Sequence, residues 1–214
     1  MSIFQRYFKN KRRNLIILLI LILPFLILLI LFYQDKASKP TFAKFKDFIF
    51  QETENKKFLF NKKDGIKIEI PENWGMVRGV DLGGTVFEDI ITFFTSDFSF
   101  KPPTGCAIEF NVKRFKKQPN NFYLSISPKE IKESIEKIEN APENQKDEQR
   151  KVIEINGFKA LQETHNLPKI ENAKDLSIEL PTKTRVLYFF VTSFSTSCQE
   201  KINDFLNKIT IENK

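Results

Sequence analysis

The chain has 214 residues, with 34 lysines and arginines against 27 aspartates and glutamates, so its formal net charge is +7. Residues 1–35 hold five of the basic and one of the acidic residues, which leaves 29 against 26, or +3, for the remainder. This near balance argues against a nucleic-acid partner, because phosphate recognition needs a concentrated basic surface. The 23 phenylalanines, ten prolines and seven glycines indicate a packed, phenylalanine-rich fold rather than a disordered chain.

Residues 15–33 form an apolar run that predicts a membrane-spanning helix. At ~1.5 Å per residue the run reaches roughly 28 Å, which matches a hydrocarbon core of about 30 Å. A cleaved signal peptide is the alternative, but such signals have a shorter apolar core and end at small residues of the A-x-A type, which do not follow here. Pro24 is compatible with a spanning helix, because membrane helices tolerate proline. We therefore expect an uncleaved anchor.

Basic residues near this run predict its orientation. Five precede it and four follow it: Arg6, Lys9, Lys11, Arg12 and Arg13, then Lys36, Lys39, Lys44 and Lys46. Positive residues favour the cytosolic side of a membrane, and the first group lies closer to the run, so we expect a cytosolic N-terminus and an extracytoplasmic C-terminal domain. The sequence thus divides into a basic N-terminus (1–14), a transmembrane helix (15–33), a linker with a short amphipathic segment (34–57) and a globular domain (58–214).

Apolar periodicity predicts the first elements after the anchor. Four apolar residues within 36–57 lie roughly on one helical face, which favours a short amphipathic helix. These are Phe42, Phe45, Phe48 and Ile49. Residues 58–60 lead through a polar turn into 66–70, where isoleucines alternate with charged residues, so a hairpin is predicted. Similar patterns predict strands over 89–95 and 107–115.

Two helices are predicted in the second half of the domain. Residues 127–130 read as a capping box with proline at the first helical position, and 197–200 repeat the capping pattern before a final amphipathic helix. The apolar face of this last helix is formed by Ile202, Phe205, Leu206 and Ile209. Between the helices, Asn156-Gly157 predicts a hairpin turn, and the apolar run 185–192 predicts a central strand. Together these elements predict an α+β fold on a mainly antiparallel sheet.

The domain resembles the PsbP-like family over residues 58–211. The family's Gly-Ile-x-Ile-x-x-Pro-x-x-Trp segment is matched by 65–74, its glycine-turn hairpin by 153–160, and its closing strand and helix by 186–211. The resemblance implies an α/β/α-type sandwich, here preceded by one transmembrane helix, and a non-catalytic accessory or assembly protein. The expected partners are the lipid bilayer, through 15–33, and another envelope protein. No cofactor or metal is predicted, since the sequence shows no ligand cluster.

The two cysteines, Cys106 and Cys198, lie in the domain expected outside the cytosol. An oxidising compartment would allow a disulfide between them, and closing a loop of roughly 90 residues could stabilise the fold by ~4 kcal/mol. The alternative is two buried thiols that never meet, because a bridge needs Cα atoms within ~7 Å. The sequence leaves both alternatives open.

Three other features are candidate sites, each with a structural alternative. A basic cluster could contact an anionic head group or wall polymer, or could be a solvated strand end. It comprises Lys113, Arg114, Lys116 and Lys117. Trp74 could be a ligand platform, although core packing is favoured for a tryptophan in this position of a PsbP-like domain. His165, the one histidine, is interpreted as a surface or loop residue rather than a catalytic base, which would need a nucleophile and an orienting group beside it.

The competing hypothesis is a membrane-anchored, sortase-like cysteine transpeptidase. Cys198 begins a predicted helix, where the dipole lowers a thiol pKa. A sortase combines its cysteine with an upstream histidine and a downstream arginine, but no arginine follows Cys198, and Arg185 precedes it. The sequence therefore favours a non-enzymatic, membrane-anchored binding or assembly module of a cell-envelope complex.

Overall fold

The computed structural model describes residues 22–24, 40–79, 89–115, 127–142, 147, 149–166 and 173–212. The chain divides into two compact units, Met1–Lys39 and Pro40–Lys214. Residues 22–24 are helical, and the rest of the run predicted to cross the membrane, 15–33, lies outside the described residues. Within the described ranges, no helix has the length and hydropathy that a membrane span requires. All other described residues belong to the second unit.

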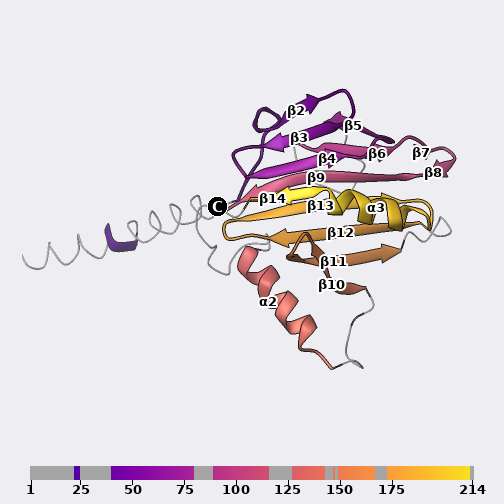
Figure 1. The fold of residues 1–214 in the computed structure, drawn as a ribbon. Helices are drawn as coiled ribbons and strands as arrows, with labels where there is room; N and C mark the ends of the chain where they lie inside the picture. The colour runs from indigo at the N-terminus through magenta and orange to yellow at the C-terminus, as the bar shows by residue number, and fades with distance from the viewer. Residues whose placement is uncertain are drawn as a thin grey trace, which may run out of the picture. The chain divides into compact units, whose positions relative to one another are not determined.

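A large antiparallel sheet forms the centre of the second unit, with eight strands among the described residues (Figure 1). The hydrogen-bonded order is β10-β11-β12-β13-β9-β6-β5, and β1 pairs with β9 outside this path. The bounds are β1 Thr41–Phe42, β5 Trp74–Arg78, β6 Ile91–Thr95, β9 Cys106–Arg114, β10 Arg150–Ile155, β11 Phe158–Asn166, β12 Lys174–Pro181 and β13 Arg185–Ser193. Strand β13 pairs on both sides, with β12 and β9, which confirms that the apolar run 185–192 is a central strand.

A smaller antiparallel sheet has the strand order β14-β4-β3-β2. Its strands are β2 Ile49–Glu52, β3 Lys57–Asn61, β4 Ile66–Ile70 and β14 Ile209–Ile211. The β3–β4 hairpin confirms the prediction from alternation, since Ile66 and Ile68 are buried while Lys67 between them is exposed. A separate short hairpin joins β7, Ser99–Phe100, to β8, Pro103–Thr104.

The N-terminal part of this unit differs from the predicted linker and amphipathic helix within residues 34–57. The chain instead forms β1, a single 3-10 turn η1 (Phe45–Asp47), and β2. Ala43 and Phe48 are buried in the main core, and the compact unit begins at Pro40 rather than at residue 58. Helical spacing misled here because Phe42 lies in β1, Phe45 in the 3-10 turn and Ile49 in β2, and β1 pairs with β9 far along the chain.

Helices α2 (Pro128–Glu139) and α3 (Cys198–Asn207) both form where the sequence predicts them. The capping box of α2 is confirmed, since the Ser127 hydroxyl accepts from the Glu130 N–H and the Glu130 carboxylate accepts from the Ser127 N–H. The capping box predicted for α3 is wrong. Ser197 already has helical backbone angles and makes no side-chain cap hydrogen bond, whereas a capping side chain needs an extended backbone.

The end of α3 also differs from the prediction. The helix ends at Asn207, and Ile209 is the first residue of β14, where it pairs with Ile68 of the small sheet. Ile209 has no exposed surface, and it would be buried either at the end of a longer helix or at the start of a strand. Its position one turn after Phe205 therefore could not distinguish the two structures.

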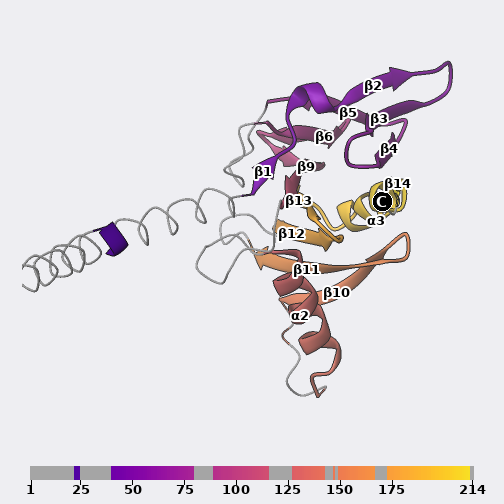
Figure 2. The same ribbon diagram turned by 90° about the vertical axis from the view of Figure 1, so that its left-hand side faces the viewer.

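The two helices cover opposite faces of the large sheet. Val186 of β13 packs in a cluster with Ile131 and Ile135 of α2, whereas its neighbour Leu187 belongs to the main core that includes α3. Successive strand residues point to opposite faces, which explains this division. Figure 2 shows α2 at the β10–β11 end of the large sheet and α3 next to β14 of the small one.

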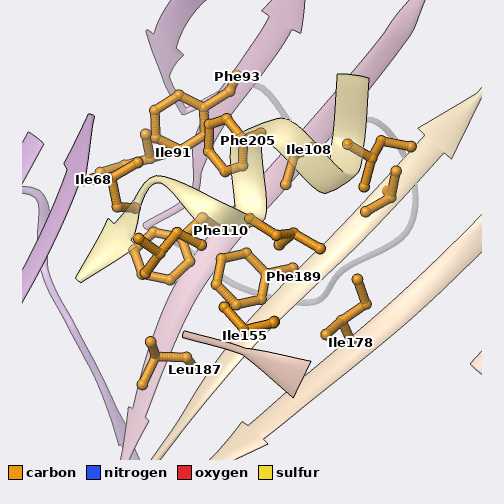
Figure 3. Packing of buried hydrophobic residues seen from close by; sticks show 14 of the residues in the cluster. Ile68, Ile91, Phe93, Ile108, Phe110, Ile155, Ile178, Leu187, Phe189 and Phe205 are labelled. Atoms are coloured by element: carbon orange, nitrogen blue, oxygen red, sulfur yellow. The ribbon is translucent and has the colours of Figure 1, made fainter. Parts of the chain in front are cut away.

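Aromatic side chains fill the main core between the two sheets and α3 (Figure 3). The ring centroid of Phe205 lies 4.8 Å from that of Phe93 and 5.1 Å from that of Trp74. Phe110 and Phe189, on neighbouring strands, stack at 5.0 Å. The phenylalanine-rich composition thus forms a continuous core.

Candidate functional site

Strand β2 forms an open edge of the small sheet. It pairs with β3 on one side, and no described strand pairs with it on the other. All four of its residues are exposed, and they include two large apolar side chains, Ile49 at 49 % and Phe50 at 38 % exposure. We call residues Ile49–Glu52 the open edge.

The turn after β2 shows which main-chain groups of the open edge point outward. The N–H of Thr53 donates to the carbonyl of Lys56 at 2.8 Å, so this pair is hydrogen-bonded. Hydrogen-bonded and non-hydrogen-bonded pairs alternate along antiparallel strands, so the pair at Glu52 is non-hydrogen-bonded and the pair at Gln51 is hydrogen-bonded. The N–H and C=O groups of Phe50 and Glu52 therefore face away from β3.

The open edge presents apolar side chains on both faces of the small sheet. Ile49 lies in register with Phe60 on the outer face. Beside it, the Lys67 ammonium lies 4.4 Å from the ring centroid of Phe58 and 5.7 Å from that of Phe60. Phe50 lies in register with a buried leucine on the other face. A chain that runs along the edge would meet apolar contacts on either side.

This arrangement suits the addition of an extended peptide as a further strand. Main-chain hydrogen bonds from Phe50 and Glu52 would supply affinity, and the alternate side chains of the peptide would contact Ile49 and Phe50. Natural edge strands are commonly protected by proline, lysine or inward-pointing charges. The open edge has a single charged residue, Glu52, whose carboxylate lies 3.7 Å from the exposed Lys57 ammonium.

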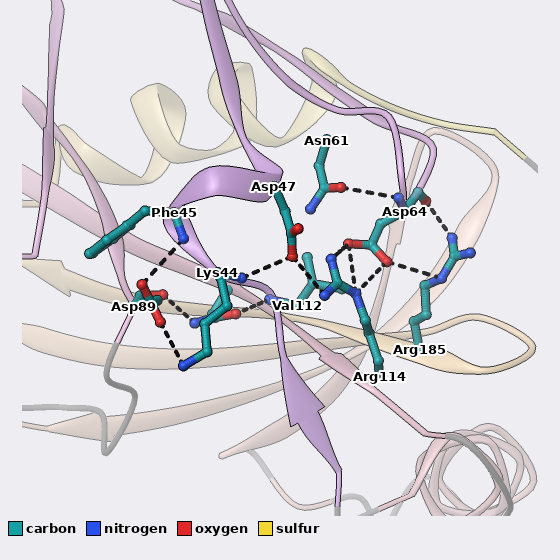
Figure 4. Close-up of polar contacts among 10 residues, drawn as sticks. Lys44, Phe45, Asp47, Asn61, Asp64, Asp89, Val112, Arg114 and Arg185 are labelled. Carbon is teal, nitrogen blue, oxygen red and sulfur yellow. Dashed lines mark hydrogen bonds and ion pairs between the residues drawn. The ribbon is translucent and has the colours of Figure 1, made fainter.

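An ion cluster joins the small sheet to the large one (Figure 4). The buried Asp64, in the β3–β4 turn, accepts hydrogen bonds from Arg114 of β9 at 2.9 Å, and its carboxylate lies 3.3 Å from Nε of Arg185 of β13. Arg114 also contacts Asp47 of η1 at 2.7 Å, and Asn61 accepts from the Asp64 N–H at 3.1 Å. Two cations thus face two anions, which fixes the position of the small sheet.

The same cluster shifts the pKa of Asp47. Burial alone would raise this pKa, but hydrogen bonds from the Lys44 main chain and the Arg114 side chain, together with the Arg114 charge, lower it below its ordinary value. Nearby, the Lys44 ammonium lies 2.9 Å from Asp89, and this hydrogen bond is the largest cause of the lowered pKa of Asp89. Both carboxylates are therefore ionised at neutral pH and bind η1 to the body of the domain.

The predicted basic cluster does not form one surface. Arg114 faces the ion cluster, and Lys113, the preceding strand residue, points to the other face of the large sheet. The other two members, Lys116 and Lys117, lie outside the described residues. The structure therefore does not bring Lys113 and Arg114 together as a contact for an anionic polymer.

Lys113 instead lies over an aromatic ring in a largely buried environment. Its ammonium is 5.0 Å from the ring centroid of Tyr188. Burial lowers the pKa of Lys113 and raises that of Glu179, while the charges of the two groups oppose these shifts. Burial and nearby carboxylates also raise the pKa of Tyr188 to about 12. These groups form a partly buried polar strip on the α2 side of the sheet.

Trp74 lies in the main core. Its side chain is 6 % exposed and packs against Phe205 of α3. Trp74 also contributes to the lining of a surface pocket that includes Asp97 and Lys201. Because the residue is almost completely buried, little of the indole is available for a ligand to stack on.

Cys106 and Cys198 are brought together. Both thiols are free and fully buried in the main core, and each cysteine shifts the pKa of the other. The Ser195 hydroxyl lies 3.6 Å from the Cys198 sulfur. The two distant segments that carry these cysteines therefore meet, as a disulfide requires, while the bond itself stays a prediction.

The residues of the sortase-like hypothesis are separated. The strand register places Cys106, beside Cys198, on the core face of the large sheet and His165 on the other face. Arg185 lies at the far end of β13 from Ser193, the register partner of Cys106, which is ~26 Å along an extended strand. Arg185 contacts Asp64 instead.

Sequence reasoning missed the open edge and the ion cluster. The polar run 53–56 between two short apolar segments is a hairpin signal, and it could have revealed β2. Asp64 lies in the Asn61-to-Gly65 turn, where an aspartate is ordinary turn chemistry. Its two arginine partners come from strands 50 and 121 residues further along the chain, which no local pattern predicts.

Comparison with known proteins finds similar solved structures, two of which are described here. No protein-family model matches the chain, and no curated protein matches it. The structure is similar to the solution structure of cyanobacterial PsbP (CyanoP) from Synechocystis, with 10 % sequence identity, 82 % of this chain and 94 % of that chain covered, and a TM-score of 0.40. It is also similar to a crystal structure from Bacteroides thetaiotaomicron, with 12 % identity, 70 % and 46 % coverage respectively, and a TM-score of 0.39.

Proposed function

We propose that this protein is a membrane-anchored, non-enzymatic module of a cell-envelope complex, which binds an extended segment of a partner protein along the open edge. Residues 15–33 act as the tether, and the second unit is a PsbP-like domain outside the cytosol. The open edge is the single observation that carries the proposal, because its exposed apolar side chains and outward main-chain groups suit a partner strand.

The size of the open edge limits the affinity expected from it. Four residues provide the outward main-chain groups of Phe50 and Glu52, so a docked strand gains few hydrogen bonds, each worth only about 1 kcal/mol net. Two exposed apolar side chains add contact area, but the interface stays below the ~1,200 Å² of a standard stable complex. A tether in the same membrane as the partner would raise the local concentration and compensate for a weak single contact.

The distribution of charged side chains favours a protein partner over an anionic polymer at the open edge. Arg114 and Arg185 are engaged with Asp64, and the ammonium of Lys67 lies over two phenylalanine rings. The exposed surface of the open edge is instead apolar with one acidic residue. An uncharged or mildly basic extended segment of a neighbouring envelope protein fits this surface.

A photoreactive phenylalanine analogue at Phe50 of the full-length protein tests the docking site in intact membranes. We expect irradiation to give a discrete adduct with one protein. The matched control carries the same analogue at Lys129 of α2, whose side chain is 61 % exposed and far from the open edge in sequence. Equal adducts from both positions, or none at position 50, would contradict the proposed site.

Carbonate extraction at alkaline pH tests the tether separately. We expect the full-length protein to stay in the membrane pellet, because a spanning helix resists extraction, whereas peripheral proteins are released. Release of the full-length protein would overturn the anchor while leaving the docking experiment interpretable.

A further inference from the structure

Cys106 and Cys198 form a buried dithiol that connects β9 to α3. Cys106 is the first residue of β9, Cys198 is the first residue of α3, and neither side chain has exposed surface. Both belong to the main core, and the segments that carry them are hydrogen-bonded, since the Phe194 N–H, four residues before Cys198, donates to the carbonyl of Gly105 at 3.1 Å. The fold thus brings the two cysteines from distant segments close together, as a disulfide requires.

Polar groups hold the main chain on both sides of this dithiol. The Cys106 N–H donates to Thr95 Oγ1 at 3.0 Å, and the same hydroxyl donates to the Cys106 carbonyl at 3.3 Å. On the other side, the Cys198 N–H donates to the Ser195 carbonyl at 3.2 Å, and that carbonyl also accepts from Ser193 at 3.0 Å. These hydrogen bonds define the closed arrangement that a disulfide would lock.

The two thiols differ in their acidity. A hydrogen bond from Cys106 is the largest cause that lowers the pKa of Cys198 to about 6, with a further contribution from the Ser195 hydroxyl, while burial opposes the shift. The same contact with Cys198, together with burial, raises the pKa of Cys106. Cys198 is therefore the more acidic thiol of the pair.

Access to the dithiol is also unequal. Residues 196 and 197, just before Cys198, are exposed, and the first turn of α3 lacks a side-chain cap. Opening of this turn would expose Cys198, because uncapped helix ends open at low free-energy cost. Cys106 would stay in β9, in register with Ser193 of the central strand β13.

We propose that Cys198 is the attacking thiol and Cys106 the resolving thiol of a disulfide that locks the start of α3 to the central sheet. The oxidant is another disulfide, either glutathione disulfide or that of a protein oxidoreductase. The Cys198 thiolate attacks one sulfur of the oxidant and expels the other as a thiolate, which leaves a mixed disulfide. Cys106 then gives up its proton, attacks the Cys198 sulfur and expels the second thiolate. The chain loses two protons and two electrons, and the oxidant becomes two thiols.

Reaction of the reduced, detergent-solubilised full-length protein with glutathione disulfide tests this order. Intact mass and alkylation should show that the wild type loses both free thiols and retains no glutathione. The Cys106→Ala variant should retain one glutathione at Cys198, and the Cys198→Ala variant should react at least ~10-fold more slowly. Two alkylatable thiols in the treated wild type, or equally fast capture at Cys106, would overturn the proposal.

The Tm gives a second readout, because modification of a thiol without formation of the Cys106–Cys198 disulfide would not raise it. We expect oxidation to raise the Tm of the wild type by roughly 5 to 15 °C, since closing a long loop restricts the unfolded chain. A thiol reductant should reverse the rise, and Cys106→Ala should show no such rise. Circular dichroism of each variant checks that it has folded, and equal Tm values for the oxidised and reduced wild type would contradict the lock.

Discussion

Strands β13 and β2 both carry large apolar residues but have opposite roles. β13 pairs on both sides in the large sheet, and its alternate residues are buried beneath α2 or in the main core. β2 pairs on one side only among the described strands, and all four of its residues are exposed. The difference shows that an apolar strand contributes to stability when both its edges and both its faces are covered. An apolar strand with an open edge is available for binding.

Core truncation should give the largest contrast between the two regions. Phe205→Ala removes a ring that contacts Phe93 and Trp74, so we expect a loss of ~4 kcal/mol in the free energy of unfolding. Phe50→Ala at the open edge should cost less than ~1 kcal/mol. Chemical denaturation of the full-length protein in detergent measures both, and similar losses would remove the distinction between core and edge.

Removing a buried charge from the ion cluster should destabilise the protein more than removing an exposed charge from the open edge. Asp64→Asn leaves Arg114 and Arg185 short of an anion in a mostly buried position, which should destabilise the protein by ~3 kcal/mol. Glu52→Gln breaks an exposed pair with Lys57 and should change stability by less than ~0.5 kcal/mol. The denaturation midpoints of the two variants test this difference. If Asp64→Asn left the stability unchanged, the cluster would not hold the small sheet in place.

Proline substitutions should distinguish the two sides of β2. The Gln51 N–H faces β3, so Gln51→Pro removes a ladder hydrogen bond and should cost ~2 kcal/mol or more. The Phe50 N–H faces outward, so Phe50→Pro should cost less than about 1 kcal/mol of stability while removing a docking donor. Thermal unfolding of the two variants checks which N–H faces β3. If Phe50→Pro lowered the Tm more than Gln51→Pro, the assignment of inward and outward N–H groups would be reversed.

Acid should reveal a smaller contribution from Asp47. Its folded pKa is lowered, so its stabilisation is fully present above the unfolded pKa of about 3.9 and is lost as the pH falls through the folded pKa. We expect the wild type to exceed Asp47→Asn in the free energy of unfolding by about 1 kcal/mol at pH 7, and the two to converge as the pH falls through the folded pKa of Asp47. Taking the difference removes the opposite pH dependence of Glu179, whose raised pKa favours its neutral form. A difference that does not change with pH would contradict this assignment.

Local sequence patterns predicted the elements whose signals are contained in a short window. Alternation predicted β4, the Ser127 box predicted the start of α2, and the doubly apolar run 185–192 predicted the central strand. The period of strands also implies that Lys113 and Arg114 point to opposite faces, so these two residues cannot belong to one basic surface.

Long-range pairing explains what the sequence could not predict. β1 pairs with β9 across some seventy residues of chain, from Thr41 to Arg114, and β14 pairs with β4, so neither strand has its partner within a local window. The contacts of Asp64 and of the two cysteines have the same origin. Their partners are set by the strand register, which a single sequence does not display.

Photo-crosslinking that depends on the outward main-chain groups of β2 tests strand addition at the open edge most directly. A photoreactive analogue at Phe50 of the membrane-bound protein would be combined with Glu52→Pro, which removes the outward N–H, or with Glu52→Gln, which keeps this N–H and removes only the charge. The account predicts that the adduct is lost with Glu52→Pro and kept with Glu52→Gln. An adduct that persists with Glu52→Pro, in protein whose Tm is unchanged, would contradict strand addition at the open edge.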